Sequence, residues 1–134
     1  MKNLLLLAFS IAFCSTLLAQ AQPKIRYNQG FLSYKFEIGD KDASQKEVKL
    51  HLEKTSPNAA EKYHQSEVAG HRALLCSIIM LGGAVVGIVS KDADVQLYGY
   101  SAVVAAGVGT LIFNISRKSK LEKSIDIYNR QFGY

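Results

Sequence analysis

The sequence has few of the residues on which catalytic and disulfide-rich proteins depend. Its 134 residues include two cysteines, Cys14 and Cys76, and because each lies inside an apolar run, no disulfide framework is available. It contains no Gly-rich phosphate loop, nucleophile elbow, paired catalytic carboxylates or Cys-x-x-Cys motif. We therefore expect a protein that is not an enzyme and uses no cofactor.

Two long apolar runs contain no Asp, Glu, Lys, Arg or His. They are Leu74 to Val89 and Leu97 to Ile115, and the polar bridge Ser90 to Gln96 joins them. Each run approaches the roughly 20 residues that cross a bilayer as a helix. The sequence therefore predicts a mainly α membrane protein with an antiparallel two-helix transmembrane hairpin, its spans at about 73–90 and 97–115. Because ion and proton pathways usually need buried ionisable groups, the runs argue against a transporter or pump.

Residues 1–21 have the pattern of a secretory signal peptide. Lys2 supplies the positive start, Leu4 to Leu18 the apolar stretch, and Ala19-Gln20-Ala21 a small-x-small cleavage site. The mature chain is then expected to begin at Gln22. An uncleaved anchor helix is the alternative, and the short apolar stretch and good cleavage signal disfavour it.

Residues 22–56 are expected to form a small exported region, a β-hairpin followed by a short helix. Ile25 to Ile38 carries aromatic and β-branched residues in partial alternation around Asn28-Gln29-Gly30, the composition of a short hairpin. Gly39-Asp40-Lys41 is predicted to form a turn. A lone two-stranded hairpin is marginal in water, so this one must pack on the following helix, the membrane surface or another copy.

Two capping signals mark the starts of helices. Ser44 and Glu47 have the capping-box spacing, which predicts a helix that ends near Lys54. A strand over Val48 to Leu52 is the alternative, because apolar residues alternate there. Ser56-Pro57 marks the start of a second helix, with the serine as cap and the proline at the first position.

Residues 57–134 are predicted to form the helical hairpin with an extension on each arm. No proline interrupts the chain between Pro57 and Ser90, so the first helix should run into the first span and project into water as a stalk. Beyond the second span, Leu121, Ile125 and Tyr128 fall along one helical stripe. They predict a basic amphipathic C-terminal tail that continues the second helix.

Small residues recur along both apolar runs. Gly83 and Gly87 form one four-residue ladder, and Ser101, Ala105 and Gly109 form another. In lipid, close backbone approach through small residues is a main source of helix contact. These faces could close the hairpin on itself, or they could join several hairpins, and we expect a homo-oligomer in the lipid bilayer. The expected helix-packing residues are Gly82, Gly83, Gly87, Gly99, Ser101, Ala105, Gly107 and Gly109.

The formal net charge of +5 fits contact with anionic lipid head groups better than a nucleic-acid site, because the chain carries no glycine-aromatic nucleic-acid motif.

Two topology signals disagree. A cleaved signal peptide places the N-terminal segment and C-terminal tail in the periplasm. The distribution of cations predicts the opposite, with the N-terminal segment and the C-terminal tail in the cytoplasm. The bridge contains only Lys91, whereas several cations flank the apolar runs. These are Arg72, Arg117, Lys118, Lys120 and Lys123. We expect the signal to dominate, which favours the inner membrane. The alternatives are a leader that fails to translocate the stalk, and a hairpin that is exported whole and enters the outer membrane.

A metal site has one weak candidate. Glu61-x-x-His64 has the carboxylate–histidine spacing of metal-binding helical bundles, and Glu67 and His71 continue near that face. One such motif supplies too few ligands without a second copy or helix. Solvated polar residues on a stalk are therefore the favoured interpretation.

The order of pieces resembles a group of small, uncharacterised exported two-helix membrane proteins of Gram-negative bacteria. The matching residues are Tyr27, Gly30, Leu32, Asn58, Ala59, Tyr63, Gly82, Gly83, Gly87, Lys123, Ser124, Ile125, Tyr128 and Asn129. More distantly, the small-residue ladders resemble the glycine-zipper proteins of bacterial envelopes. The resemblance implies an envelope location and oligomeric packing, and it brings no known activity.

The sequence thus favours a bacterial cell-envelope membrane protein of structural or interaction type, which self-associates and can display its exported region to an envelope protein partner. A small pore-forming or membrane-permeabilising protein is the alternative, with Ser77, Ser101, Thr110 and Asn114 facing a lumen. A metal-dependent activity at Glu61 and His64 is a third and weaker hypothesis.

Overall fold

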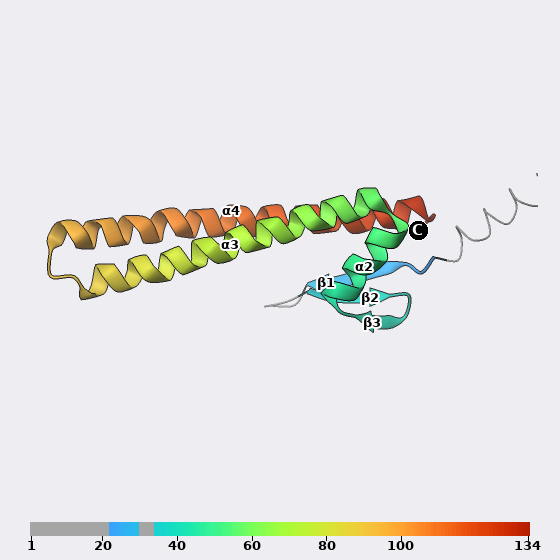
Figure 1. Ribbon diagram of the computed structural model, residues 1–134, viewed down its shortest axis with the longest axis horizontal. Helices are drawn as coiled ribbons and strands as arrows, with labels where there is room; N and C mark the ends of the chain where they lie inside the picture. Colours follow the sequence, from blue (N-terminus) through green and yellow to red (C-terminus); the bar gives the residue numbers. More distant parts are fainter. Residues whose placement is uncertain (1–21, 30–33) are drawn as a thin grey trace, which may run out of the picture. The chain divides into compact units, whose positions relative to one another are not determined.

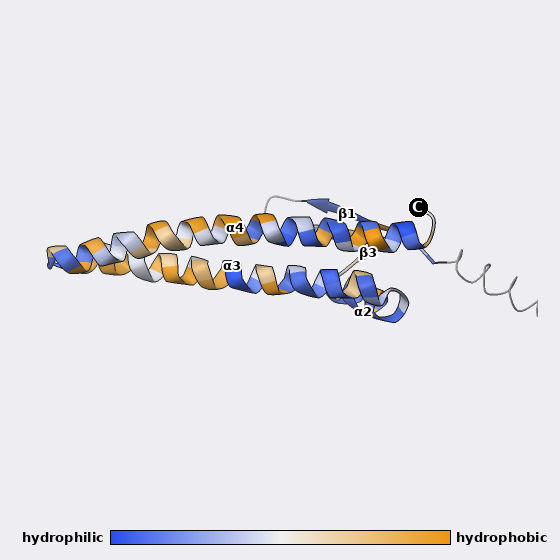
Figure 2. Cartoon of the chain, turned by 90° about the horizontal axis from the view of Figure 1, so that it is seen from above, coloured by the Kyte–Doolittle hydropathy of each residue, from blue (hydrophilic) through white to orange (hydrophobic). Residues whose placement is uncertain are grey.

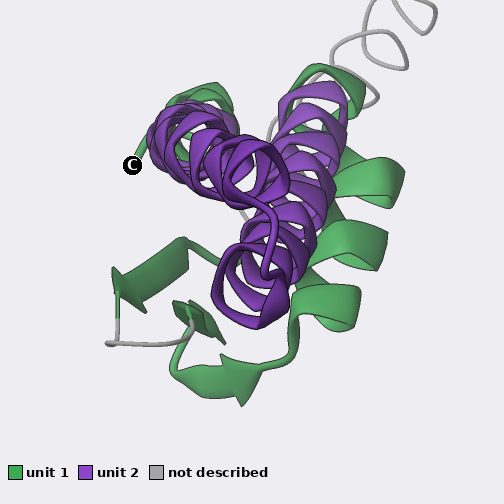
Figure 3. Ribbon diagram, turned by 90° about the vertical axis from the view of Figure 1, so that its left-hand side faces the viewer, with its two compact units in different colours: residues 1–59, 125–134 green, residues 60–124 purple. Residues whose placement is uncertain are grey.

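The computed structural model describes residues 22–29 and 34–134, so the predicted signal peptide and Gly30 of the predicted hairpin turn lie outside the described residues. The chain divides into two compact units, of which unit 1 comprises the residues up to Ala59 together with Ile125–Tyr134 (Figure 3). Unit 2 comprises Ala60–Ser124. The C-terminal residues therefore belong with the N-terminal sheet, and the hairpin body forms the other unit.

The sheet of unit 1 has three antiparallel strands in the order β1-β2-β3 (Figure 1). β1 (Ile25–Gln29) and β2 (Tyr34–Ile38) confirm the predicted hairpin. The prediction of two strands is wrong, because β3 (Lys41–Ala43) pairs with β2 and the turn shortens to Gly39-Asp40. Gly39 has φ of +66°, a left-handed conformation that favours glycine, and it allows this tight reversal.

Side chains alternate across the sheet, as the pleat of a strand requires. Ile25 and Phe36 are buried, whereas Arg26, Lys35 and Glu37 are exposed. The buried side of unit 1 also takes apolar residues from the helices. They are Val48, Leu52, Ala59, Ile125 and Tyr128. The predicted hairpin therefore belongs to a small core closed by helical residues.

Helix α2 (Gln45–Thr55) begins at the predicted capping box. Ser44 Oγ accepts a hydrogen bond from the Glu47 amide at 3.3 Å, and a Glu47 carboxylate oxygen accepts one from the Ser44 amide at 2.7 Å. The Ser44 hydroxyl also donates to the same carboxylate oxygen, at 2.7 Å. The two bonds from the Ser44 amide and hydroxyl favour the ionised carboxylate, so they lower the pKa of Glu47. The helix ends at Thr55, one residue past the predicted Lys54, and the alternative of a strand over Val48 to Leu52 is wrong.

Helix α3 (Pro57–Val89) starts at the predicted proline and continues through the first apolar run. Helix α4 (Ala93–Gln131) continues from the second run into the C-terminal tail. The bridge is shorter than predicted, because α4 begins at Ala93 and not at Leu97. Asp92 Oδ1 caps this start by accepting from the amides of Asp94 at 2.9 Å and Val95 at 3.3 Å. Both helices are long and apolar enough to cross a membrane, by length and composition.

Candidate functional site

The two helices of unit 2 approach most closely at glycines. A Cβ atom built on Gly83 would lie 2.8 Å from the carbonyl oxygen of Gly99, and one built on Gly99 would lie 2.6 Å from the amide nitrogen of Gly87. Real Cβ atoms essentially never approach other atoms so closely. These three glycines therefore bring backbone against backbone, and no other residue type fits this contact.

The contact extends along both helices in antiparallel order. Tyr100 lays its ring against Gly87, with 2.9 Å from the ring to a Cβ built on that glycine. Farther along, Cys76 Sγ would lie 3.0 Å from a Cβ on Gly109, and the Arg117 side chain would lie 3.2 Å from a Cβ on Gly70. Residue numbers thus fall along α3 as they rise along α4. We call this line of contacts the glycine seam.

The seam follows alternating steps of three and four residues. On α4 it runs through Gly99, Ala102, Ala106 and Gly109, where Ala102 Cβ would lie 3.1 Å from a Cβ on Gly83 and Ala106 is buried. This seven-residue period is typical of antiparallel helices with a small crossing angle. Ala102 and Ala106 are not among the predicted packing residues, because the predicted ladders had four-residue steps; the alternating steps of three and four residues would have indicated both.

The predicted packing residues divide between the seam and the surface. Gly83, Gly87, Gly99 and Gly109 lie in the seam, and a Cβ on Gly107 would meet only Met80 Sδ, at 3.8 Å. A Cβ on Gly82 would meet nothing within 4 Å. Ser101 and Ala105 are exposed, although their predicted ladder partner Gly109 is in the seam. Gly82, Ser101 and Ala105 therefore contribute small residues to the outer surface of unit 2, and we call them the outer small residues.

Large apolar side chains of unit 2 point outward along both apolar runs. Ile88 is 73% exposed, Leu97 is 65% exposed and Ile115 is 70% exposed, while Gly87 and Ala106 are buried. Figure 2 shows hydrophobic residues gathered in the parts of α3 and α4 that flank their connection. The order of a water-soluble helix pair is inverted here, because small residues are inside and large apolar residues are outside.

Hydroxyl groups of the predicted polar stripe bond to their own helices. Ser77 Oγ donates to the Ala73 carbonyl at 3.0 Å, Ser101 Oγ to Leu97 at 2.8 Å and Thr110 Oγ1 to Ala106 at 2.9 Å. Asn114 is exposed. Each of the three hydroxyls therefore has an intrahelical acceptor four residues earlier, as serine and threonine in membrane helices commonly do.

The residues of the metal hypothesis make ordinary contacts within α3. Glu61 accepts a hydrogen bond from Gln65 at 2.9 Å, and His64 Nδ1 lies 3.7 Å from Glu67. Within residues 22–29 and 34–134, no group of three or more His, Cys, Asp or Glu residues is placed to hold a metal ion. Nearby, burial raises the pKa of Tyr63 to about 12, and the charge of Glu67 acts in the same direction.

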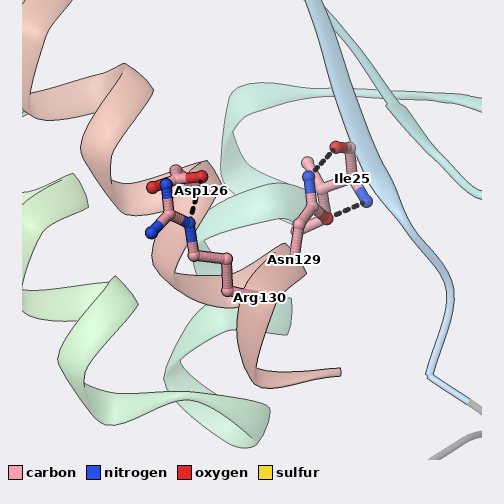
Figure 4. A network of polar contacts seen from close by, with 4 residues as sticks. All are labelled: Ile25, Asp126, Asn129 and Arg130. Atoms are coloured by element: carbon pink, nitrogen blue, oxygen red, sulfur yellow. Dashed lines mark hydrogen bonds and ion pairs between the residues drawn. The ribbon is translucent and has the colours of Figure 1, made fainter. Parts of the chain in front are cut away.

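A second cluster lies in unit 1, where the C-terminal turn binds the N-terminal segment. The side-chain amide of Asn129 pairs with both backbone groups of Ile25: its nitrogen donates to the carbonyl at 2.9 Å, and its oxygen accepts from the amide at 3.1 Å (Figure 4). This pairing satisfies the outward-facing backbone groups of Ile25 on β1, an edge strand of the sheet. The hydroxyl of Tyr134 donates to the Gln22 carbonyl at 2.7 Å.

Tyr128 is fully buried at the centre of the same cluster. Its hydroxyl donates to the Pro23 carbonyl at 2.8 Å and lies 2.8 Å from His51 Nε2. Because the hydroxyl has one proton, His51 Nε2 is the donor in the second bond. Burial, followed by the charge of Lys54, lowers the pKa of His51, and burial raises the pKa of Tyr128 to about 12. We call Pro23, Ile25, His51, Tyr128 and Asn129 the tail cluster.

Comparison of the chain with protein-family models, curated proteins and solved structures finds no match.

Proposed function

We propose that the protein is an integral membrane protein of the bacterial cell envelope with a structural or interaction role. The observation that carries this proposal is the inverted burial of unit 2, where glycine and alanine occupy the seam and large apolar residues face outward. Only 11% of the most apolar stretch of each long helix is buried. Exposed apolar surface on this scale is unfavourable in water and favourable in hydrocarbon.

The seam supports the same proposal from inside the hairpin. Helices in lipid gain no hydrophobic free energy from association, so they associate through close packing of small residues. The backbone contact among Gly83, Gly87 and Gly99 is of this kind. A water-soluble pair of helices would instead bury leucine and isoleucine between them.

The tail cluster bears on topology. Asn129 and Tyr128 bind residues of the N-terminal segment within unit 1, which supports a topology with both ends of the described chain on the same side of the bilayer. A hairpin that crosses the membrane twice has this topology. We propose that this side is the periplasm, because the leader has the pattern of a cleaved secretory signal.

Location and topology can be tested with single cysteines in a Cys76→Ser background. Lys41, Lys91 and Lys123 are suitable positions, because all three are exposed and none caps a helix. We expect the protein to resist carbonate extraction, Lys41→Cys and Lys123→Cys to react with an impermeant maleimide in intact spheroplasts, and Lys91→Cys to react only after lysis. Extraction by carbonate would overturn the membrane proposal, and labelling of Lys91→Cys alone would reverse the topology.

Self-association is the second part of the proposed function. Because the seam glycines are occupied within one hairpin, contact between copies is assigned to the outer small residues Gly82, Ser101 and Ala105. A Cβ built on Gly82 has no neighbour within 4 Å and the position is exposed, so Gly82→Leu should block a neighbouring copy and leave the hairpin intact.

The test is the mass of the detergent-solubilised protein over a range of concentrations, measured by sedimentation. We expect oligomers that dissociate in the double variant Gly82→Leu/Ala105→Leu and persist in the matched control Val85→Leu, a position that is already large and 60% exposed. A protein that is monomeric at every concentration would contradict self-association, as would a double variant that assembles like the wild type.

A further inference from the structure

Cations gather on unit 2 where its apolar runs end. Arg72 and Lys118 are exposed, and the Arg117 side chain crosses Gly70, which places residues 70 and 117 at the same level of the hairpin. Leu74 and Ile115 end the two apolar runs on this side. Both are exposed and lie within a few residues of these cations. The full set, which we call the cationic base, is Arg72, Arg117, Lys118, Lys120 and Lys123.

The opposite end of the hairpin has the reverse charge balance. Lys91 is its only cation, and Asp92 and Asp94 accompany it. The cationic base has acidic neighbours as well: Glu67 precedes it on α3, and Glu122 lies 4.0 Å from Lys118. Cations still outnumber carboxylates at the base, so the hairpin is electrically asymmetric along its length.

We infer that the cationic base is a binding surface for anionic phospholipid head groups, and this inference rests on the proposed membrane function. The phosphate level of a leaflet lies just outside the hydrocarbon, where Ile115 and Leu74 give way to the cations. Arg and Lys can lay their stems along apolar surface and present the charge to phosphate. Arg72 fits this description, because its guanidinium lies 6.0 Å from the centroid of the Phe113 ring.

Electrostatic attraction supplies the selectivity. Cations near an anionic leaflet each strengthen the attraction several-fold, and arginine in addition forms paired hydrogen bonds with phosphate oxygens. The end with Lys91, Asp92 and Asp94 offers no such excess. The lipids around the base are therefore enriched in anionic species, and those around the other end are not.

Two single-tryptophan variants test this inference, because the chain contains no tryptophan of its own. Ile115→Trp reports on lipid at the base, and Val89→Trp, at a position 72% exposed, reports on lipid near the other end. Quenching by brominated phosphatidylglycerol is compared with quenching by brominated phosphatidylcholine in reconstituted vesicles. We expect a preference for the anionic lipid of about fivefold or more at Ile115→Trp, falling with added salt, and a ratio near 1 at Val89→Trp.

Charge variants identify the residues responsible. Arg72→Gln/Lys118→Gln/Lys120→Gln removes three of the five cations and should lower the ratio at Ile115→Trp by more than half. The matched control Lys35→Gln/Lys41→Gln/Lys46→Gln removes the same net charge from unit 1 and should leave the ratio unchanged. Equal ratios at both reporters, or a ratio unaffected by the first triple variant, would overturn the inference. A protein that fails to enter vesicles would instead overturn the proposed membrane function.

Discussion

Unit 1 and the apolar part of unit 2 bury opposite kinds of side chain. The largest fully buried side chains of unit 1 are Tyr128, Ile25 and Leu52, whereas the apolar part of unit 2 buries Gly87 and Ala106 and exposes its leucines and isoleucines. Unit 1 thus has the core of a small water-soluble domain. The apolar part of unit 2 has large apolar side chains on its surface, which fits the proposed membrane location.

The same contrast holds for how each unit brings distant segments together. Unit 1 joins segments more than 100 residues apart in sequence through side-chain hydrogen bonds to the backbone, as between Asn129 and Ile25. Unit 2 joins its helices by backbone contact at Gly83 and Gly99. Polar side chains can compensate an exposed strand edge in water, while close packing must hold helices where no hydrophobic gain is available.

The largest loss of stability is expected for a substitution in the glycine seam of unit 2. In Gly99→Ala the new methyl would lie 2.6 Å from the Gly87 amide nitrogen and 2.8 Å from the Gly83 carbonyl oxygen. Backbone atoms cannot rotate away, so the helices must separate, at a cost of about 1–3 kcal/mol in hairpin stability. The measurement is the loss of energy transfer between dyes on Gln65→Cys and Lys123→Cys during titration with a denaturing detergent.

Gly82→Ala is the matched control for this variant. It adds the same methyl to a helix glycine in the same unit, where nothing lies within 4 Å. We expect its midpoint to equal that of the wild type or to rise slightly, because alanine is the better helix former. Equal midpoints for Gly99→Ala and the wild type would show that the seam is not closed in solution.

A smaller loss of stability is expected when the Asn129 side chain of unit 1 is removed. Asn129→Ala leaves the amide and carbonyl of Ile25 without their side-chain partner, and we expect a loss of about 1–2 kcal/mol in the stability of unit 1. Asn129→Asp keeps the acceptor for the Ile25 amide but places a carboxylate oxygen against the Ile25 carbonyl, so it should not restore stability. Urea unfolding followed by the near-ultraviolet circular dichroism of the tyrosines measures both variants. Full stability in either variant would contradict the assigned role.

Local signals predicted much of this fold from the sequence. The capping box at Ser44 and the proline at Pro57 mark the starts of α2 and α3, because these residues satisfy free backbone groups wherever they stand. β3 escaped prediction, because Lys41–Ala43 is three residues long and has no apolar alternation. The start of α4 at Ala93 was not predicted either, because an aspartate such as Asp92 is equally common in a polar loop and at a helix N-cap.

Contacts between distant residues carried weaker signals. The apolar stripe of Leu121, Ile125 and Tyr128 predicted an amphipathic tail, and all three are buried. Nothing local in the sequence indicates that Asn129 pairs with Ile25, because an asparagine near the end of a helix can bond many partners. The sequence indicated only glycines of the seam. Ala102 and Ala106 were not predicted, because alanine is common at any position of a helix.

The smallest expected effect is a dependence of the stability of unit 1 on pH. Burial lowers the pKa of His51 from its usual value near 6.5, so at mildly acidic pH the unfolded chain binds a proton that the folded chain does not. The stability of unit 1 should therefore fall as pH drops through and below about 6.5. A second loss should begin below about 4.5, because the hydrogen bonds from Ser44 lower the pKa of Glu47.

The variant His51→Gln separates the two losses. Glutamine can still donate a hydrogen bond to the Tyr128 hydroxyl, but it does not titrate, so the loss below pH 6.5 should vanish while the loss below 4.5 remains. Urea midpoints from about pH 2.5 to 7.5 follow unit 1, and energy transfer between the dyes follows unit 2 in the same samples. The apolar part of unit 2 contains no titratable carboxylate or histidine between residues 73 and 90 or 97 and 115, so its midpoint should change little over this range. A slope that persists in His51→Gln would assign the mildly acidic loss to another group and remove His51 from the stability of the tail cluster.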